Sequence, residues 1–156
     1  MINQKAKIKI FQTPFPHIMI TDFLKKESMK KVKKALENIS FYKKDADLFQ
    51  FKQTNDLNDV EDKTLQELKK QLMYFIPEIE ELTKTRLNKV KIDIAGSLYQ
   101  DTDYLLCHDD KLEKRKIAYI YYLTSLKMTD GGTLNLFASK NNTPTQVAKK
   151  IVPRKN

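Results

Sequence analysis

Short alternating segments and one amphipathic stretch organise the start of the chain. Lysine and isoleucine alternate at the start of Lys7–Phe11, which is predicted to be a short edge strand, and His17–Ile20 is predicted to be a second short strand after the turn that Pro14-Phe15-Pro16 imposes. Leu24–Ile39 is predicted to be an amphipathic helix with a lysine-rich outer face. Its apolar stripe consists of Leu24, Met29, Val32, Ala35, Leu36 and Ile39.

Strand and helix patterns alternate in the next part of the chain. Leu48–Thr54 alternates and is predicted to be a strand, and Asn55–Asp59 is polar and turn-like. A helix is predicted over Lys63–Phe75, where leucines recur at helical spacing. Pro77 suits the first turn of a further helix over Glu78–Leu87, because proline lacks the N–H group that is unpaired there anyway.

The second half has the pattern of antiparallel strands with short connections. Val90–Tyr99 alternates, and Ile117–Thr124 is apolar on both faces, which predicts a central strand. Thr133–Phe137 is predicted to be a further strand, and Asn141–Pro144 a turn. Helices followed by such strands predict an α+β fold with a sheet sandwich or barrel.

The chain is strongly basic, but its lysines are spread along the sequence. It has 29 Lys and Arg against 20 Asp and Glu, a net charge of +9. This excess favours an anionic neighbourhood such as nucleic acid, whereas scattered lysines without interleaved aromatic residues are typical of a solvated surface. The single cysteine, Cys107, excludes an internal disulfide and suits a reducing compartment. No apolar run approaches the ~20 residues of a membrane helix.

A His-x-Asp motif stands directly after the apolar residues Tyr104-Leu105-Leu106. In an extended segment, side chains two residues apart point to the same face, so His108 and Asp110 can converge on one metal ion. An imidazole and a carboxylate make two thirds of the 2-His-1-carboxylate triad that holds non-haem Fe(II) and leaves positions open. On its own, the bare motif is more often a surface turn than a metal site.

Five runs of the chain, in collinear order from about Pro14 to Asn156, carry a family resemblance. They are PFPHIMITDFL, DLFQFKQTNDL, YLLCHDDKLEKRKIAYIYYLT, DGGTLNLF and IVPRKN. The chain resembles the N-terminal part of the 2-oxoglutarate- and Fe(II)-dependent prolyl 3-hydroxylases of ribosomes, within the prolyl 4-hydroxylase-like dioxygenase superfamily. Those enzymes act on a proline of a small-subunit ribosomal protein.

The resemblance implies the architecture. We expect an α+β fold in the form of a partial double-stranded β-helix, or jelly-roll, with N-terminal helices packed on the sheet. Residues 1–156 would form a single incomplete catalytic domain. Its helical and strand part would reach about residue 88, and its β-helix strands would run from about residue 89, truncated before the last core strands.

The resemblance also implies the site. His108 and Asp110 match the first two iron ligands, and Tyr122 matches a tyrosine that hydrogen-bonds 2-oxoglutarate. Leu106 would line the cosubstrate site, and no catalytic residue is expected besides the metal ligands. The implied cofactors are Fe(II), 2-oxoglutarate as cosubstrate, and ascorbate. His17 matches a structural Pro-Phe-Pro-His turn of the family.

The chain departs from the family pattern after Asp110. The family's distal iron-binding His and the Arg that pairs with 2-oxoglutarate have no match, because no His follows His108 and neither Arg115 nor Arg154 stands at the matching position. We therefore expect a prolyl hydroxylase by ancestry whose 156 residues alone are inactive.

Three functional interpretations follow. The first is a dioxygenase that hydroxylates a prolyl residue of a ribosomal protein, in the cytoplasm, the nucleus or both, without membrane attachment. The second is a non-catalytic fragment or protein-interaction module of the translation machinery. The third is a basic protein that binds RNA. It is the least favoured of the three, because direct binding of nucleic acid is not expected. A salt-dependent affinity for RNA would favour the third.

Overall fold

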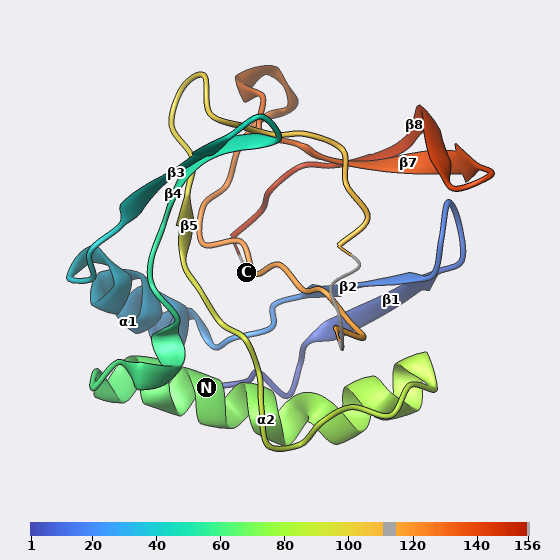
Figure 1. The fold of residues 1–156 in the computed structure, drawn as a ribbon. Helices are drawn as coiled ribbons and strands as arrows, with labels where there is room; N and C mark the ends of the chain where they lie inside the picture. Colours follow the sequence, from blue (N-terminus) through green and yellow to red (C-terminus); the bar gives the residue numbers. More distant parts are fainter. Residues whose placement is uncertain (111–114, 156) are drawn as a thin grey trace. The chain divides into compact units, whose positions relative to one another are not determined.

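The computed structural model describes residues 1–110 and 115–155, and these form two compact units (Figure 1). The first unit comprises Met1 and Lys30–Tyr119, and the second comprises Ile2–Met29 and Ile120–Asn156. The expected single domain with a change of character near residue 88 remains a prediction.

Helices supply most of the core of the first unit. Helix α1 spans Lys26–Glu37, and its residues from Lys30 onward belong to this unit. Helix α2 spans Lys63–Thr83. Asp62 caps its N-terminus, because the Asp62 carboxylate accepts hydrogen bonds from the backbone N–H groups of Thr64 and Leu65. A short 3-10 helix, η1 (Leu57–Asp59), precedes α2. The buried side chains of these elements are Val32, Ala35, Leu57, Leu65, Leu68 and Ile76.

A small antiparallel sheet completes the first unit. Strand β4 (Phe49–Gln53) pairs along one edge with β3 (Tyr42–Ala46). Its other edge pairs with two short strands, β5 (Ser97–Leu98) and β6 (Tyr104–Leu105). Because side chains alternate along a strand, Phe49 and Phe51 share a face of β4, and their ring centroids lie 5.6 Å apart.

The second unit consists largely of two hairpins. Strands β1 (Lys7–Phe11) and β2 (His17–Thr21) form one, and β7 (Leu134–Lys140) and β8 (Thr143–Ile151) form the other. The 3-10 helix η2 (Met128–Asp130) precedes β7. The β7–β8 turn places Asn141 and Asn142 in the left-handed region that asparagine tolerates.

Lys149 and His17 join the two hairpins of this unit. The ammonium group of Lys149 lies 3.1 Å from the Phe11 ring centroid and 3.0 Å from His17 Nε2. His17 also stacks on Phe11, with ring centroids 4.9 Å apart. Its Nδ1 lies 2.8 Å from the backbone carbonyl of Phe15, which accepts the Nδ1 proton. These contacts support the structural role predicted for His17.

The predicted helix boundary at Pro77 is wrong. Helix α2 continues through this residue to Thr83. Proline removes one backbone hydrogen bond within a helix, but Ile76 is buried beside it, and this packing favours continuation. Lys84 then ends the helix in the left-handed conformation.

Two predicted strands of the second half are also wrong. Within Val90–Tyr99 only Ser97–Leu98 is a strand, because backbone groups upstream bond to the η1 region instead of a ladder: Leu57 N donates to Ile94 O at 2.9 Å. Ile117–Thr124, predicted as a central strand, forms no strand. A central strand needs a ladder on both sides, and no sheet of the described residues includes this segment.

Two strands went unpredicted because their sequences are polar. Tyr42–Ala46 is exposed throughout and became an edge strand by pairing with β4. Thr143–Ile151 was predicted in part as a turn, yet it pairs along β7. The prediction of an α+β fold is confirmed, with two α-helices and several small antiparallel sheets among the described residues.

Candidate metal centre

Strand β4 positions the segment that leads to His108. Tyr104 and Leu105 pair with Gln50 and Phe49, and the backbone N–H of Leu106 donates to the carbonyl of Leu48 at 2.8 Å. Backbone hydrogen bonds therefore fix the chain as far as Leu106, two residues before His108.

A turn stabilised by Asp103 delivers this segment to the sheet. The Asp103 carboxylate accepts a hydrogen bond from the backbone N–H of Gln100 at 2.8 Å and one from Gln50 Nε2 at 3.2 Å. Both bonds favour the charged carboxylate, the backbone bond most, and they hold the pKa of Asp103 below its ordinary value. The hydrogen bond that joins the Asp103 turn to Gln50 of β4 is thus present at neutral pH.

His108 and Asp110 converge, as predicted. His108 Nδ1 lies 2.8 Å from the carbonyl of Leu106, and because a carbonyl only accepts, Nδ1 carries the proton. The lone pair of the neutral ring is then on Nε2, which lies 3.5 Å from Asp110 Oδ1. A metal-binding histidine ordinarily shows this pattern, with its second ring nitrogen bonded to a carbonyl.

The convergence does not arise from an extended strand. Strand β6 ends at Leu105, and Asp110 has a φ of 53°, in the left-handed region. The backbone therefore turns at Asp110, and this turn directs its carboxylate back toward the imidazole. Two donors about 2.1 Å from one cation and at right angles lie about 3.0 Å apart, so the observed separation suits adjacent ligands after a small adjustment.

A guanidinium group adjoins this pair. Arg115 Nη1 lies 3.0 Å from Asp110 Oδ1, the same oxygen that faces His108. The Asp110 side chain is 48% exposed and that of Arg115 33%. Arg115 has no predicted role in the site, and its contact with Asp110 becomes evident only in the structure.

The described residues supply two donors and not a complete triad. Over residues 1–110 and 115–155, no group of three or more His, Cys, Asp or Glu side chains is placed to hold a metal ion. A neutral imidazole and a carboxylate match the chemistry of an Fe(II) site in two positions. The assignment of His108 and Asp110 as iron ligands remains a prediction that this geometry supports.

The two candidate cosubstrate residues lie in different units. Leu106, in the first unit, is 49% exposed and precedes the donor pair. Tyr122, in the second, is half-buried, and burial raises the pKa of its phenol. The phenol therefore stays protonated at neutral pH and can donate a hydrogen bond. The roles predicted for both residues remain predictions.

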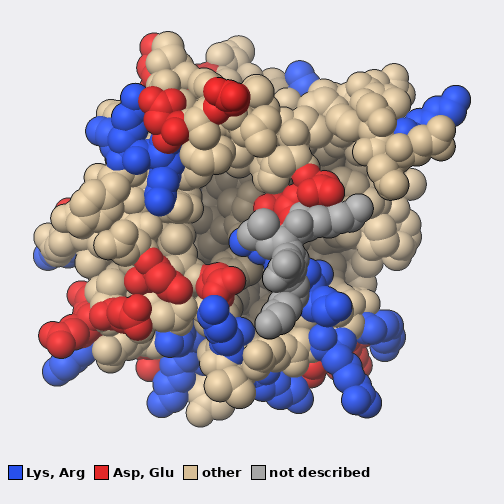
Figure 2. Space-filling view, in the orientation of Figure 1, with Lys and Arg blue, Asp and Glu red and all other residues tan. Residues whose placement is uncertain are grey.

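Basic side chains are exposed in many parts of the described chain. Figure 2 shows lysine and arginine side chains at several separate places on the visible face, with acidic side chains among them. This distribution agrees with a solvated surface. Neither helix of the described residues combines the length and apolar character needed to cross a membrane.

Comparison with known proteins gives one family and several relatives. Residues 94–156 match the 2OG-Fe(II) oxygenase superfamily. The chain is 36% identical over 158 residues to prolyl 3-hydroxylase OGFOD1 of Xenopus laevis, covering 99% of this chain and 31% of that protein. It is 34% identical to the Mus musculus protein of the same name, over 96% of this chain and 28% of the relative.

A third relative comes from an insect. Prolyl 3-hydroxylase sudestada1 of Drosophila melanogaster is 33% identical over 95% of this chain and 29% of its own length. The chain therefore spans less than a third of the length of each of these relatives, while nearly all of the chain takes part in each alignment.

Proposed function

We propose, from the premise that this chain is related to the prolyl 3-hydroxylases of the 2OG-Fe(II) oxygenase superfamily, that it supplies the first two iron donors of a peptidyl-proline hydroxylase. The alignments confirm the resemblance inferred from the sequence. The observation that carries the proposal is the convergence of His108 Nε2 and Asp110 Oδ1 to 3.5 Å.

The residues take distinct roles in this proposal. His108 and Asp110 hold Fe(II), with the imidazole oriented by its bond to the Leu106 carbonyl. The protonated phenol of Tyr122 donates a hydrogen bond to a carboxylate of 2-oxoglutarate, and Leu106 lines the cosubstrate site. Bound Fe(II), together with 2-oxoglutarate and O2, supplies the oxidising power for C–H hydroxylation, and ascorbate keeps the metal reduced.

Two further features belong to the proposal. The fold of the complete catalytic domain is a double-stranded β-helix, and the small antiparallel sheets of this chain are compatible with part of it. The substrate is a prolyl residue of a ribosomal protein, met in the cytoplasm, the nucleus or both. The relatives' names support the prolyl part of this statement, since they are called prolyl 3-hydroxylases.

Catalysis by these 156 residues alone is not expected. Two donors bind Fe(II) weakly, and the described residues complete no three-residue metal site. A missing arginine would also deprive 2-oxoglutarate of a charge-assisted partner. The activity proposed here is therefore that of a polypeptide that joins this chain to a third donor and to an arginine.

Succinate formation tests the proposal directly. We would incubate the 156-residue chain, and a gene product extended beyond Asn156, with Fe(II), 2-oxoglutarate, ascorbate and proline-containing ribosomal peptides. We expect succinate and hydroxyproline from the extended product, loss of both in its His108→Ala variant, and neither from the short chain. An inactive extended product contradicts the proposal, and turnover by the short chain shows that a third donor is present.

A second candidate function is a protein-interaction module. It is favoured by apolar side chains that remain exposed beside β4: Leu98, Tyr99, Leu105 and Leu106 are each 44–49% exposed. His108→Ala separates the two candidates, because it removes a metal ligand but leaves these side chains in place. Ribosome association that survives this substitution, without any turnover, would support the second candidate.

A further inference from the structure

We propose that Arg115 is the counter-ion of Asp110 before metal binds, and that its charge weakens the hold of the His108–Asp110 pair on a divalent cation. The inference rests on the proposed function, because it takes this pair as the iron donors. It assigns a role to a residue outside the ligand set.

The guanidinium of Arg115 and the imidazole of His108 face the same oxygen atom of Asp110. Asp110 Oδ1 lies 3.0 Å from Arg115 Nη1 and 3.5 Å from His108 Nε2. A cation shared by the imidazole and the carboxylate must approach this same oxygen. The guanidinium therefore either leaves Oδ1 when the cation arrives or remains within a few ångströms of a second positive charge.

The imidazole does not depend on the arginine for its orientation. His108 Nδ1 bonds to the Leu106 carbonyl, and Leu106 is fixed to β4 by its own N–H bond to Leu48. The left-handed backbone at Asp110 sets the direction of the carboxylate. Removing Arg115 would thus leave the donors near each other.

Charge is then the main quantity that Arg115 changes. Arginine stays protonated at any pH at which the protein is folded, so the repulsion is permanent. The ion pair is partly exposed, with side-chain exposures of 33% and 48%, so solvent and salt weaken the effect without removing it. We expect about a three- to tenfold loss of divalent-cation affinity from this charge.

The experiment measures Mn²⁺ binding to the 156-residue chain by the electron paramagnetic resonance signal of free Mn²⁺, at low and at high salt. Mn²⁺ probes the donor pair without oxygen chemistry. Arg115→Gln removes the charge, and Arg115→Lys keeps the charge but loses the planar guanidinium. Arg86→Gln removes an exposed positive charge elsewhere in the same unit, close enough to Glu80 to influence it.

We expect Arg115→Gln to bind Mn²⁺ about three- to tenfold more tightly than the unmodified chain at low salt, with a smaller gain at high salt. Arg115→Lys should stay within about twofold of the unmodified chain, and Arg86→Gln should gain less than Arg115→Gln. If Mn²⁺ binding can be measured only in Arg115→Gln and not in the unmodified chain, that result also supports the inference. Unchanged or weaker binding in Arg115→Gln overturns it, and weaker binding would show that the arginine orients Asp110.

His108→Ala separates failure of this inference from failure of the proposed function. If the Mn²⁺ affinity of the unmodified chain persists in His108→Ala, the proposed iron pair is wrong whatever Arg115 does. If neither the unmodified chain nor Arg115→Gln binds Mn²⁺, the role of Arg115 fails, because removing its charge restores no measurable affinity. If His108→Ala abolishes binding and Arg115→Gln does not improve it, only the role of Arg115 fails. Circular dichroism of each variant checks that it is folded.

Discussion

Two regions of the first unit differ in how they are held. From Thr54 to Ile76, five side chains are buried, those of Thr54, Leu57, Leu65, Leu68 and Ile76, and Leu65 is only 2% exposed. From Leu98 to Asp110, every side chain except that of Asp103 is exposed. The first region is held by packing, whereas the second is held by a few hydrogen bonds to β4 and by the Asp103 turn.

The difference separates the scaffold from the candidate chemistry. Burial of apolar surface is the larger stabilising contribution, and a segment with few buried contacts opens more easily than the core. The donor pair therefore sits on the less stable of the two regions. Adjustment of His108 and Asp110 to a cation should cost little, because few packed side chains would have to move.

The largest expected effect comes from the packed region. Leu65→Ala should lower the free energy of unfolding by about 2–5 kcal/mol, because it leaves a cavity where a leucine is fully enclosed. Leu106→Ala is the matched variant in the exposed region, and it should cost under about 1 kcal/mol. Urea denaturation measures both. Equal losses would erase the contrast between the regions.

A buried hydroxyl should give the next largest effect. Thr54 Oγ1 accepts from Gly96 N at 3.0 Å and donates to Asn55 O at 2.7 Å, and the residue is 3% exposed. Thr54→Val should cost about 1–3 kcal/mol, because it leaves the Gly96 N–H group without this partner. Thr129→Val, at an exposed hydroxyl, is the control for urea denaturation. A neutral Thr54→Val would show that water replaces the hydroxyl.

The start of α2 should give a smaller effect. Asp62 Oδ1 accepts from Thr64 N at 2.8 Å and from Leu65 N at 3.0 Å, so Asp62→Ala removes both capping bonds. We expect a loss of about 1 kcal/mol in unfolding free energy, and little loss for Asp62→Asn, which keeps a capping oxygen. Equal losses for the two variants would mean that the charge, and not the cap, matters.

The smallest effect concerns alkaline pH. Partial burial, followed by the charges of Asp93 and Asp56, raises the pKa of Tyr119 to about 12. Its hydroxyl donates to the Asp93 carbonyl at 3.0 Å. A pKa raised in the folded state contributes stability that is complete below the ordinary value of 10.0 and is lost as pH rises through about 12.

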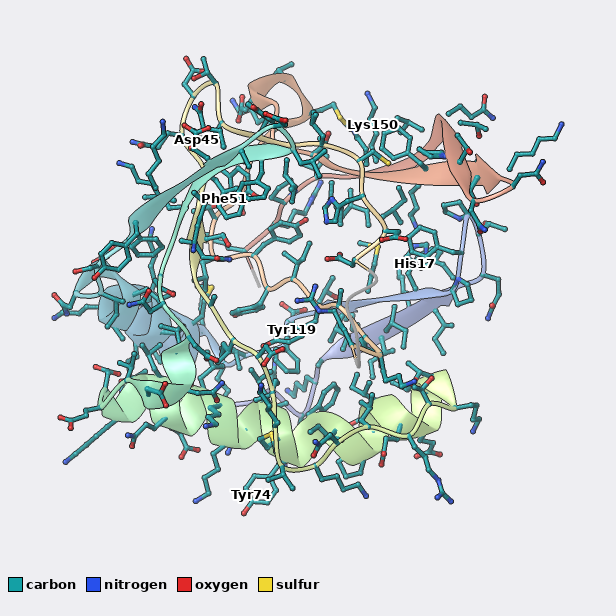
Figure 3. All side chains as sticks on the ribbon, viewed as in Figure 1. His17, Asp45, Phe51, Tyr74, Tyr119 and Lys150 are labelled. Atoms are coloured by element: carbon teal, nitrogen blue, oxygen red, sulfur yellow. The ribbon has the colours of Figure 1, made fainter. Side chains whose placement is uncertain are left out.

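Tyr119→Phe should therefore flatten the decline of melting temperature between pH 10 and about pH 12. The decline should not vanish, because burial also raises the pKa of Tyr121 to about 12. Tyr74→Phe is the control, since its ring extends from α2 and is 70% exposed (Figure 3). Parallel melting curves for Tyr119→Phe and the unmodified chain would contradict the assignment.

Local sequence patterns predicted the elements whose stabilising contacts are near in sequence. The stripe of α1 was recognisable because Val32 and Ala35 recur at helical spacing and are both buried. The strands predicted over Lys7–Phe11 and His17–Ile20 are present as Lys7–Phe11 and His17–Thr21, and they pair with each other. Strand β3 was missed because its partner, and not its own polar sequence, makes it a strand. The helix boundary predicted at Pro77 is wrong because burial of Ile76 outweighs the one backbone hydrogen bond that proline removes.

The candidate site was predictable in its residues but not in its geometry. The His-x-Asp motif and the surrounding resemblance led to His108 and Asp110, and these side chains converge. The convergence depends on a left-handed Asp110, which an alternating pattern does not indicate. The contact of Arg115 with Asp110 joins residues five positions apart in the sequence, and hydrophobic periodicity carries no information about it.

The central claim is that His108 and Asp110 together bind a divalent cation, and paramagnetic broadening by Mn²⁺ tests it most directly. We would titrate Mn²⁺ into the isotopically labelled chain and follow each backbone amide signal in heteronuclear spectra. The account predicts that broadening is strongest at the amides of residues 106–110 and disappears there in His108→Ala. Broadening centred instead on the acidic stretch from Asp56 to Asp62, and unaffected by His108→Ala, would contradict it.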